Sequence, residues 1–137
     1  MTTYLELLSV DRPADIGADD NDRVVFAVNF TLLSQGSITN LEREIATLIV
    51  NASLGTGLGT DIFIGTLAKL PVLTPSTPVI NITATGGLGR DKTQNDDPYE
   101  RPSCQITVRS KDYAVAQDRV LAIWRALDGL RNFSVTA

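Results

Sequence analysis

Alternating apolar and polar positions predict two half-buried strands in this chain. In the segments 24–33 and 104–109, every second residue is apolar. A period of two places the apolar side chains on one face of a sheet and most polar ones on the other. The apolar sets are Val24, Phe26, Val28, Phe30 and Leu32 in the first segment, and Cys104, Ile106 and Val108 in the second. We expect both sets to face the core.

Apolar residues spaced by three or four positions predict two helices. Thr39, with Glu42 three residues later, forms a capping box that would start the first helix, and Asp112 is placed to cap the second. The expected buried stripes are Ile45, Leu48 and Ile49 in the first helix, and Ala116, Val120, Ile123 and Leu127 in the second.

Shorter apolar segments complete the predicted fold. Further strands are expected at 4–10, 61–66, 79–84 and 131–137, and the first of these would form a hairpin with 24–33 across the acidic loop 11–23. The order β-β-α-β-β-β-α-β predicts an α+β domain, a two-layer sandwich with a mostly antiparallel twisted sheet and both helices on one face. At 137 residues, we expect residues 1–137 to form a single domain.

Two motifs imitate ligand sites without meeting their requirements. The glycine-rich segment 55–60 resembles a nucleotide loop, but a dinucleotide site needs a strand before the glycines and a helix after them. Here the predicted helix comes first and no lysine follows at the position that a Walker motif requires, so we interpret the segment as a flexible connection. The segment 11–23 lacks the ligand spacing of a calcium loop, so we interpret it as a solvated turn, with a metal site as the alternative.

The amino-acid composition excludes several classes of catalytic and metal-binding site. It contains no histidine and one cysteine, and its net charge is −4. The missing histidine excludes Ser–His and Cys–His nucleophiles and His-based zinc sites, and the acidic charge disfavours binding to nucleic-acid phosphates. We expect no catalytic residue, no cofactor and no metal site. A single cysteine indicates a reducing cytoplasm, and no apolar run approaches the roughly 20 residues that span a bilayer.

The segment 85–102 is a long polar stretch between two predicted strands. Loops of this length are uncommon in compact domains and often carry function. We therefore interpret it as a projecting hairpin that binds a partner, with an insertion of no specific role as the alternative.

Several segments together resemble a known protein family. They include Asp61-Ile62-Phe63, Tyr99-Glu100-Arg101-Pro102 before a strand, Arg109-Ser110-Lys111-Asp112-Tyr113 at the start of a helix, and Leu127-Asp128-Gly129-Leu130. This succession is similar to a family of small siphovirus proteins, the phage minor capsid proteins that act as tail terminators. The resemblance covers residues 38–137.

The resemblance implies a structural protein of the virion tail, assembled in the cytoplasm of the host bacterium. Its members form a hexameric ring that caps the tail tube, so the expected partners are further copies of this chain, the tail tube protein and a neck or head-completion protein. DNA would pass through the ring without specific binding, which suits an acidic chain. The expected contact residues, each of which could equally be an ordinary surface residue, are Arg90, Asp91, Lys92, Tyr99 and Arg101.

The first 35 residues depart from the order of that family. Its members begin with the helix found here near Thr39 and end with a hairpin that contains a Pro-x-x-Ile/Leu-Gly-x-Asp turn, which this chain carries at 13–19. Between them stand Gly36 and Ser37, the residues that a cloning linker leaves. We interpret the chain as an engineered circular permutant: 1–35 is the native C-terminal hairpin, 36–37 the joint, and 38–137 the native N-terminal part. A natural N-terminal strand arm is the alternative.

Two other functional classes remain open on the sequence alone. The chain could be a different head–tail connector or neck component, or a monomeric binding module. An enzyme that uses the glycine-rich loops and the aspartate cluster is the weakest alternative, because the chain has neither histidine nor a triad.

Overall fold

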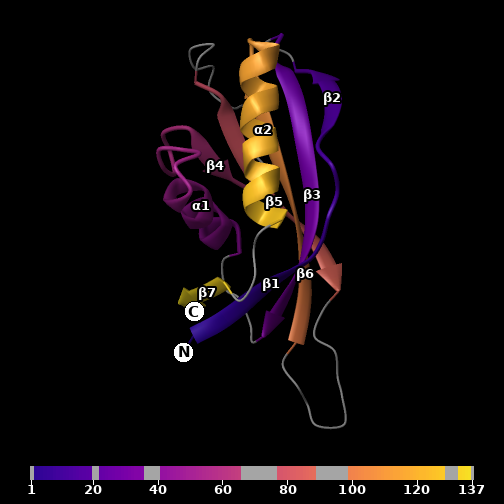
Figure 1. Cartoon of the computed structure of the whole chain (residues 1–137), viewed down its shortest axis with the longest axis vertical. Coiled ribbons are helices and arrows are strands. Elements are labelled where there is room, and N and C mark those ends of the chain that lie inside the picture. Colours follow the sequence, from indigo (N-terminus) through magenta and orange to yellow (C-terminus); the bar gives the residue numbers. More distant parts are fainter. Residues whose placement is uncertain are drawn as a thin grey trace.

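A computed structural model describes residues 2–19, 22–35, 41–65, 77–88, 99–128 and 133–136. The elements, in chain order, are β1 (Thr2–Val10), β2 (Ala14–Ala18), β3 (Val24–Gln35), α1 (Leu41–Asn51), β4 (Ile62–Ile64), β5 (Val79–Leu88), β6 (Tyr99–Ser110), α2 (Tyr113–Asp128) and β7 (Phe133–Thr136). Figure 1 shows long β3, β5 and β6 strands behind α2, with α1 beside them.

The strands form one mixed sheet of seven strands in the order β4-β5-β6-β3-β1-β7, with β2 also paired to β3. Every neighbouring pair is antiparallel except β4 and β5, which are parallel. A single core cluster contains the buried stripes of both helices and the same-facing residues of β3, β5 and β6. Both helices therefore pack on one face, and the expected α+β two-layer sandwich is confirmed.

The buried faces are those that the apolar periodicity predicts. Each of Val28, Ile106 and Val108 is 0% exposed, and Phe26 and Phe30 are nearly as buried. Among the residues of the predicted helix stripes, those at 0 or 1% exposure are Ile45, Ile49, Ala116, Val120, Ile123 and Leu127, and Ala46 of α1 is equally buried. Leu48 is half-buried at the edge of the same cluster. None of the helices described here is long and apolar enough to cross a membrane.

The structure adds one strand to the predicted order. The segment 11–23, expected to be a loop, contains β2, whose Ala14 and Asp15 pair with Ala27 and Phe26 of β3. All five residues of β2 are exposed, so no buried face imposes an apolar alternation on them. The register shifts after Asp15, where Gly17 has φ 105°, a conformation that favours glycine.

The two strands that flank the polar stretch 85–102 are longer than predicted, and their paired arms are compatible with the predicted hairpin. β5 continues to Leu88 and β6 begins at Tyr99, with Gly86, Gly87 and Leu88 paired to Ser103, Pro102 and Arg101. These arms lack apolar alternation because they extend beyond the region that the helices cover (Figure 1). The remaining segment, 89–98, lies outside the described residues.

The helix ends described by the structure satisfy their backbone groups. Asp112 accepts hydrogen bonds from the Ala114 N–H at 3.0 Å and the Val115 N–H at 3.5 Å, which confirms it as the cap of α2. The predicted cap at Thr39 lies outside the described residues. α1 ends in a Schellman motif, in which Leu54 N–H donates to Ile49 O at 3.0 Å and Ser53 adopts φ 61°.

Candidate functional site

The predicted contact residues are only partly described by the structure. Tyr99 and Arg101 lie in β6, where Tyr99 pairs with Gln35 at the end of β3. Arg101 is half-buried. Arg90, Asp91 and Lys92, together with Gly36 and Ser37 of the predicted joint, lie outside the described residues. The structure thus brings the base of the predicted hairpin next to the end of β3, and the contact role of these residues stays a prediction.

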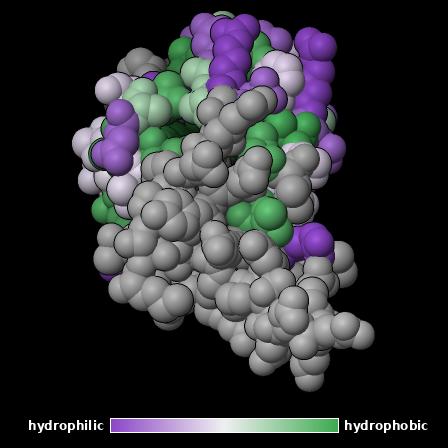
Figure 2. Space-filling model, turned by 60° about the horizontal axis from the view of Figure 1, so that its bottom comes forward, coloured by the Kyte–Doolittle hydropathy of each residue, from purple (hydrophilic) through white to green (hydrophobic). Residues whose placement is uncertain are grey.

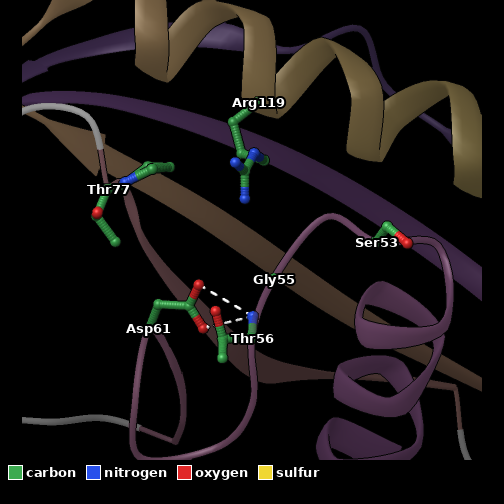
Figure 3. Close-up of a pocket in the computed structure, with 7 residues that line it drawn as sticks. Ser53, Gly55, Thr56, Asp61, Thr77 and Arg119 are labelled. Atoms are coloured by element: carbon green, nitrogen blue, oxygen red, sulfur yellow. Dashed lines mark hydrogen bonds between the residues drawn. The ribbon is translucent and has the colours of Figure 1, made fainter.

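The glycine-rich segment is an ordered turn folded around a carboxylate. Asp61, at 4% exposure, accepts hydrogen bonds from Thr56 N–H at 2.9 and 3.1 Å and from Gly57 N–H at 3.2 Å (Figure 3). These are the backbone donors that a phosphate would need in a nucleotide loop. Because an internal carboxylate occupies them, the segment is a structural turn, more ordered than the flexible connection that we predicted.

Gly55 has a packing role in the same turn. A Cβ atom at this position would lie 2.6 Å from Ile62 Cδ1, closer than side chains can approach. Ile62 is 0% exposed and belongs to the core cluster. The absence of a side chain at Gly55 therefore lets the turn pack closely against β4.

Beside this turn is a polar hollow of about 260 Å³. Its lining residues are Ser53, Gly55, Thr56, Asp61, Thr77, Pro78 and Arg119. The Arg119 guanidinium extends from α2 toward the hollow and donates a hydrogen bond to Leu54 O, which links α2 to the end of α1 (Figure 3). The hydroxyl groups of this lining have no histidine to activate them, because the chain contains none.

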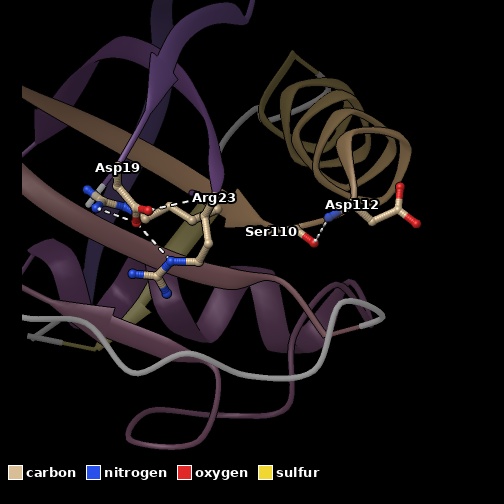
Figure 4. Close-up of polar contacts among 5 residues, drawn as sticks. Asp19, Arg23, Ser110 and Asp112 are labelled. Carbon is tan, nitrogen blue, oxygen red and sulfur yellow. Dashed lines mark hydrogen bonds and ion pairs between the residues drawn. The ribbon is translucent and has the colours of Figure 1, made fainter. Parts of the chain in front are cut away.

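A second buried polar group lies at the turn between β2 and β3. Asp19 accepts hydrogen bonds from the Arg23 backbone N–H at 3.0 Å and from Arg23 Nε at 2.8 Å (Figure 4). An Arg109 guanidinium nitrogen lies 3.5 Å from the same carboxylate. The Arg23 side chain is 4% exposed and that of Asp19 is 12% exposed. One acid of the predicted solvated turn is thus a buried structural anchor.

The described residues offer no support for metal binding or for thiol chemistry. Across the part of the chain that the structure describes, no three side chains of the histidine, cysteine, aspartate and glutamate types could together hold a metal ion. Cys104 is 1% exposed, and burial, with a smaller effect of the Glu42 charge, raises the pKa of its thiol to about 12. The thiolate, which is the reactive form, is therefore disfavoured in the folded protein.

Exposed large apolar side chains are few among the described residues. They are Ile16 at 58%, Tyr113 at 49%, Leu58 at 42% and Val50 at 36% exposure. The ring of Tyr113 lies 5.3 Å from that of Phe26 in an edge-on contact, so the fold itself uses it. In Figure 2, which turns the bottom of the view in Figure 1 forward, the coloured residues show hydrophobic surface bordered by hydrophilic residues in the upper part of the picture.

Sequence reasoning missed the residues that these observations single out. Asp61 directly follows the glycine-rich run, and an acid at that position is the signal that the run encloses its own anion. Ile16 is the single large aliphatic residue within the acidic segment 11–23, and that isolation could have marked it.

The comparison with protein families gives a specific result. A family model described as bacteriophage tail terminator protein matches residues 49–137, which is more than half of the chain. No curated protein and no solved structure matches the chain. The match begins inside α1 and includes β4, β5, β6, α2 and β7. The chain therefore belongs to the bacteriophage tail terminator family, whose members are structural proteins of the phage tail.

Proposed function

We propose that this protein terminates the tail of a siphovirus, as a ring that caps the tail tube and joins it to the neck. The family match over residues 49–137 carries this proposal. The ring would be a hexamer, with the tail tube protein below it and a neck or head-completion protein above it. The ring would be part of the virion tail, and assembly would take place in the host cytoplasm.

The physical properties of the chain are compatible with this role. A ring forms when one heterologous contact repeats with a rotation that closes, and this requires two different surfaces on each subunit. Among the described strands, the sheet has two different edges: β4 on one side, and β2 with β7 on the other. A net charge of −4 lets DNA pass without being held, because like charges repel. No enzymatic step, cofactor or specific nucleic-acid contact is part of the proposal.

A tail-tube assembly experiment tests the proposed function. Purified tail tube protein would be polymerised alone, with this chain, and with an unrelated acidic protein of similar size. We expect shorter tubes, with a ring at one tube end in negative-stain images, in the sample that contains this chain and in neither of the other two samples. Tubes of unchanged length with unmodified ends would contradict the proposal. Binding along the tube wall, or to a neck protein without an effect on length, would favour the alternative of another connector.

We also propose that the chain is circularly permuted at Gly36 and Ser37. The pairing of β1 with β7 supports this, because Thr2 lies opposite Thr136 in an antiparallel ladder and both ends of the chain lie side by side (Figure 1). A short connection there would turn the two strands into an ordinary hairpin. The family match, which leaves residues 1–48 unmatched, is compatible with the same order.

Restoring the inferred native order tests the permutation. A chain that runs from 38 to 137 and continues through 2 to 35 should fold with the same circular dichroism spectrum and cap tubes equally well. The reason is that permutation is tolerated where the joined ends lie close. A control that opens the chain inside β6 should not fold. Failure of the restored chain to fold, with the present order intact, would favour a natural N-terminal arm.

A further inference from the structure

We infer that neighbouring copies of this chain contact each other head to tail through the two opposite edges of the sheet. The β2 surface, defined as β2 with Ile16 at its centre, would pack on the α1 surface of the next copy. The α1 surface is defined by Val50 on α1 and Leu58 in the turn that covers β4. This inference rests on the proposed ring and names the surfaces that build it.

The strand pairing places the two surfaces on opposite edges. Residues 24–27 of β3 pair with β6, and β2 pairs with residues 24, 26 and 27 of the same strand. A strand has only two sides, so β2 must lie on the side away from β6. At this level the sheet therefore runs β4-β5-β6-β3-β2. Within the described residues, β2 pairs with β3 alone, and no other described strand occupies its outer edge.

The bulge in β2 presents an apolar side chain at that edge. Gly17 N–H donates to Asp15 Oδ1 at 2.9 Å, which stabilises the bulge. Between them, Ile16 is 58% exposed and takes no part in the core cluster. A single exposed isoleucine is ordinary on a protein surface. We consider Ile16 together with Val50 and Leu58, the exposed apolar residues at the opposite edge of the sheet.

The opposite edge offers a packing surface and not a pairing edge. Ile62 N–H donates to Gly57 O at 3.2 Å, and Ile62 O accepts from Gly59 N–H at 2.9 Å. The turn thus occupies the outer hydrogen-bonding groups of β4 at Ile62, which blocks the addition of a strand there. Leu58, in the middle of this turn, is 42% exposed. Contact at this edge should therefore occur through side chains.

Charge favours the contact of unlike surfaces. Around β2 the exposed acids Asp11, Asp15 and Asp22 outnumber the exposed base Arg12. On α1, the exposed face that carries Val50 also carries Arg43, seven positions earlier and thus about two turns away. Two β2 surfaces would bring exposed acids together. The exposed charge on α1 is Arg43, flanked by the half-buried Glu42 and Glu44, so a β2 surface meets less exposed like charge there. These charges argue for a head-to-tail contact with a second copy of the chain.

Cysteine crosslinking tests the contact directly. Cys104 is 1% exposed and its raised pKa leaves it unreactive, so introduced cysteines report alone. We would prepare Ile16→Cys, Leu58→Cys and the double variant, and treat each with a short bis-maleimide. On a denaturing gel, the double variant should give a ladder of covalently linked oligomers. Each single variant should give no covalent dimer. A mixture of the two single variants should give covalent dimers and nothing larger. A Leu58→Cys/Asp118→Cys variant is the matched control, since Asp118 is exposed on α2.

Opposite results would overturn the inference. Dimers formed by either single variant alone would show contact between like surfaces. Absence of a ladder from the double variant, both in solution and in the presence of tail tubes, would show that these edges do not meet.

The same samples separate this inference from the proposed function. Ile16→Asp and Leu58→Asp should each abolish rings while the melting temperature stays unchanged, since both side chains are exposed. If the parent chain caps tubes and neither variant affects capping or rings, the inference fails and the function stands. If the ladder forms but the parent chain never caps a tube, the contact stands and the function fails.

Discussion

Replacing Asp61 with alanine should lower the free energy of unfolding by about 3 kcal/mol, because hydrogen bonds to a charged group contribute about 1.5–3 kcal/mol each and are not additive. The substitution removes the acceptor of Thr56 N–H and Gly57 N–H, three contacts in total between 2.9 and 3.2 Å. Chemical denaturation followed by tryptophan fluorescence would measure the change, since Trp124 packs against the core.

Local exchange should reveal the cause of that loss. Without the carboxylate, the turn 55–60 loses the group around which it folds, and the Gly57 amide should exchange with solvent through a local opening. Asp61→Asn keeps one acceptor oxygen and should fall between the parent and the alanine variant. Asp118→Ala, at an exposed position of α2, is the matched control and should change stability by less than about 0.5 kcal/mol. Equal stabilities of Asp61→Ala and Asp118→Ala would contradict the structural role.

The loss of the Asp61 contacts should also affect self-association. Ile62 is paired to the turn through its outer N–H and C=O groups, so loosening the turn frees the edge of β4. Free edges of sheets promote non-native pairing between chains. We therefore expect light scattering from Asp61→Ala to rise with protein concentration under conditions in which the parent chain remains clear.

The core of the fold could be predicted from the sequence because burial of one face makes apolar residues recur at regular intervals, every second position in a strand and every three or four positions in a helix. Phe26, Val28, Ile106 and Val108 follow a period of two and are all buried, and the α2 stripe follows its helical spacing with no exposure at all. The same reasoning failed where strands carry no buried stripe in their sequence. β2, with every residue exposed, and the outer arms of β5 and β6 carry no such period.

The candidate sites were harder to predict because they depend on contacts between distant segments. The sequence distinguishes the glycine run from a nucleotide loop by the order of its neighbours, yet nothing in that order shows that Asp61 closes the turn. The Arg119 contact with Leu54 O joins residues 65 positions apart. Likewise, the apolar residues of the two inferred surfaces, Ile16 and Leu58, are brought into relation only by the order of strands in the sheet.

Replacing Asp19 with alanine should have an effect as large as that at Asp61. Removal of one partner of a buried ion pair costs about 3–5 kcal/mol, and we expect about 3 kcal/mol here because Asp19 retains 12% exposure. The Arg23 side chain, at 4% exposure, would lose the carboxylate that lies 2.8 Å from its Nε. Urea denaturation monitored by circular dichroism would measure the loss.

Two further variants distinguish the stability that the Asp19–Arg23 ion pair contributes from the stability lost when any acid of this segment is removed. Asp15 lies in β2, four residues before Asp19, but its carboxylate is exposed and accepts a hydrogen bond from Gly17 N–H at 2.9 Å. We therefore expect Asp15→Ala to lose about 0.5–1 kcal/mol. Asp19→Ala with Arg23→Met also removes the buried Arg23 guanidinium, so that this charge is not left without its carboxylate. The double variant should recover part of the loss, and only the more exposed Arg109 still loses its contact with Asp19. Fully additive losses in the double variant would contradict the coupling of Asp19 with Arg23.

The position of Asp19 also connects folding with assembly. Its carboxylate bonds to Arg23 at the start of β3 and lies 3.5 Å from Arg109 of β6, so it holds the end of β2 against two central strands. If β2 forms the contact with the next copy, Asp19→Ala should weaken rings at temperatures at which the variant is still folded. Native mass spectrometry below the unfolding transition would measure this, and rings as abundant as those of the parent chain would show that assembly does not require a fixed β2.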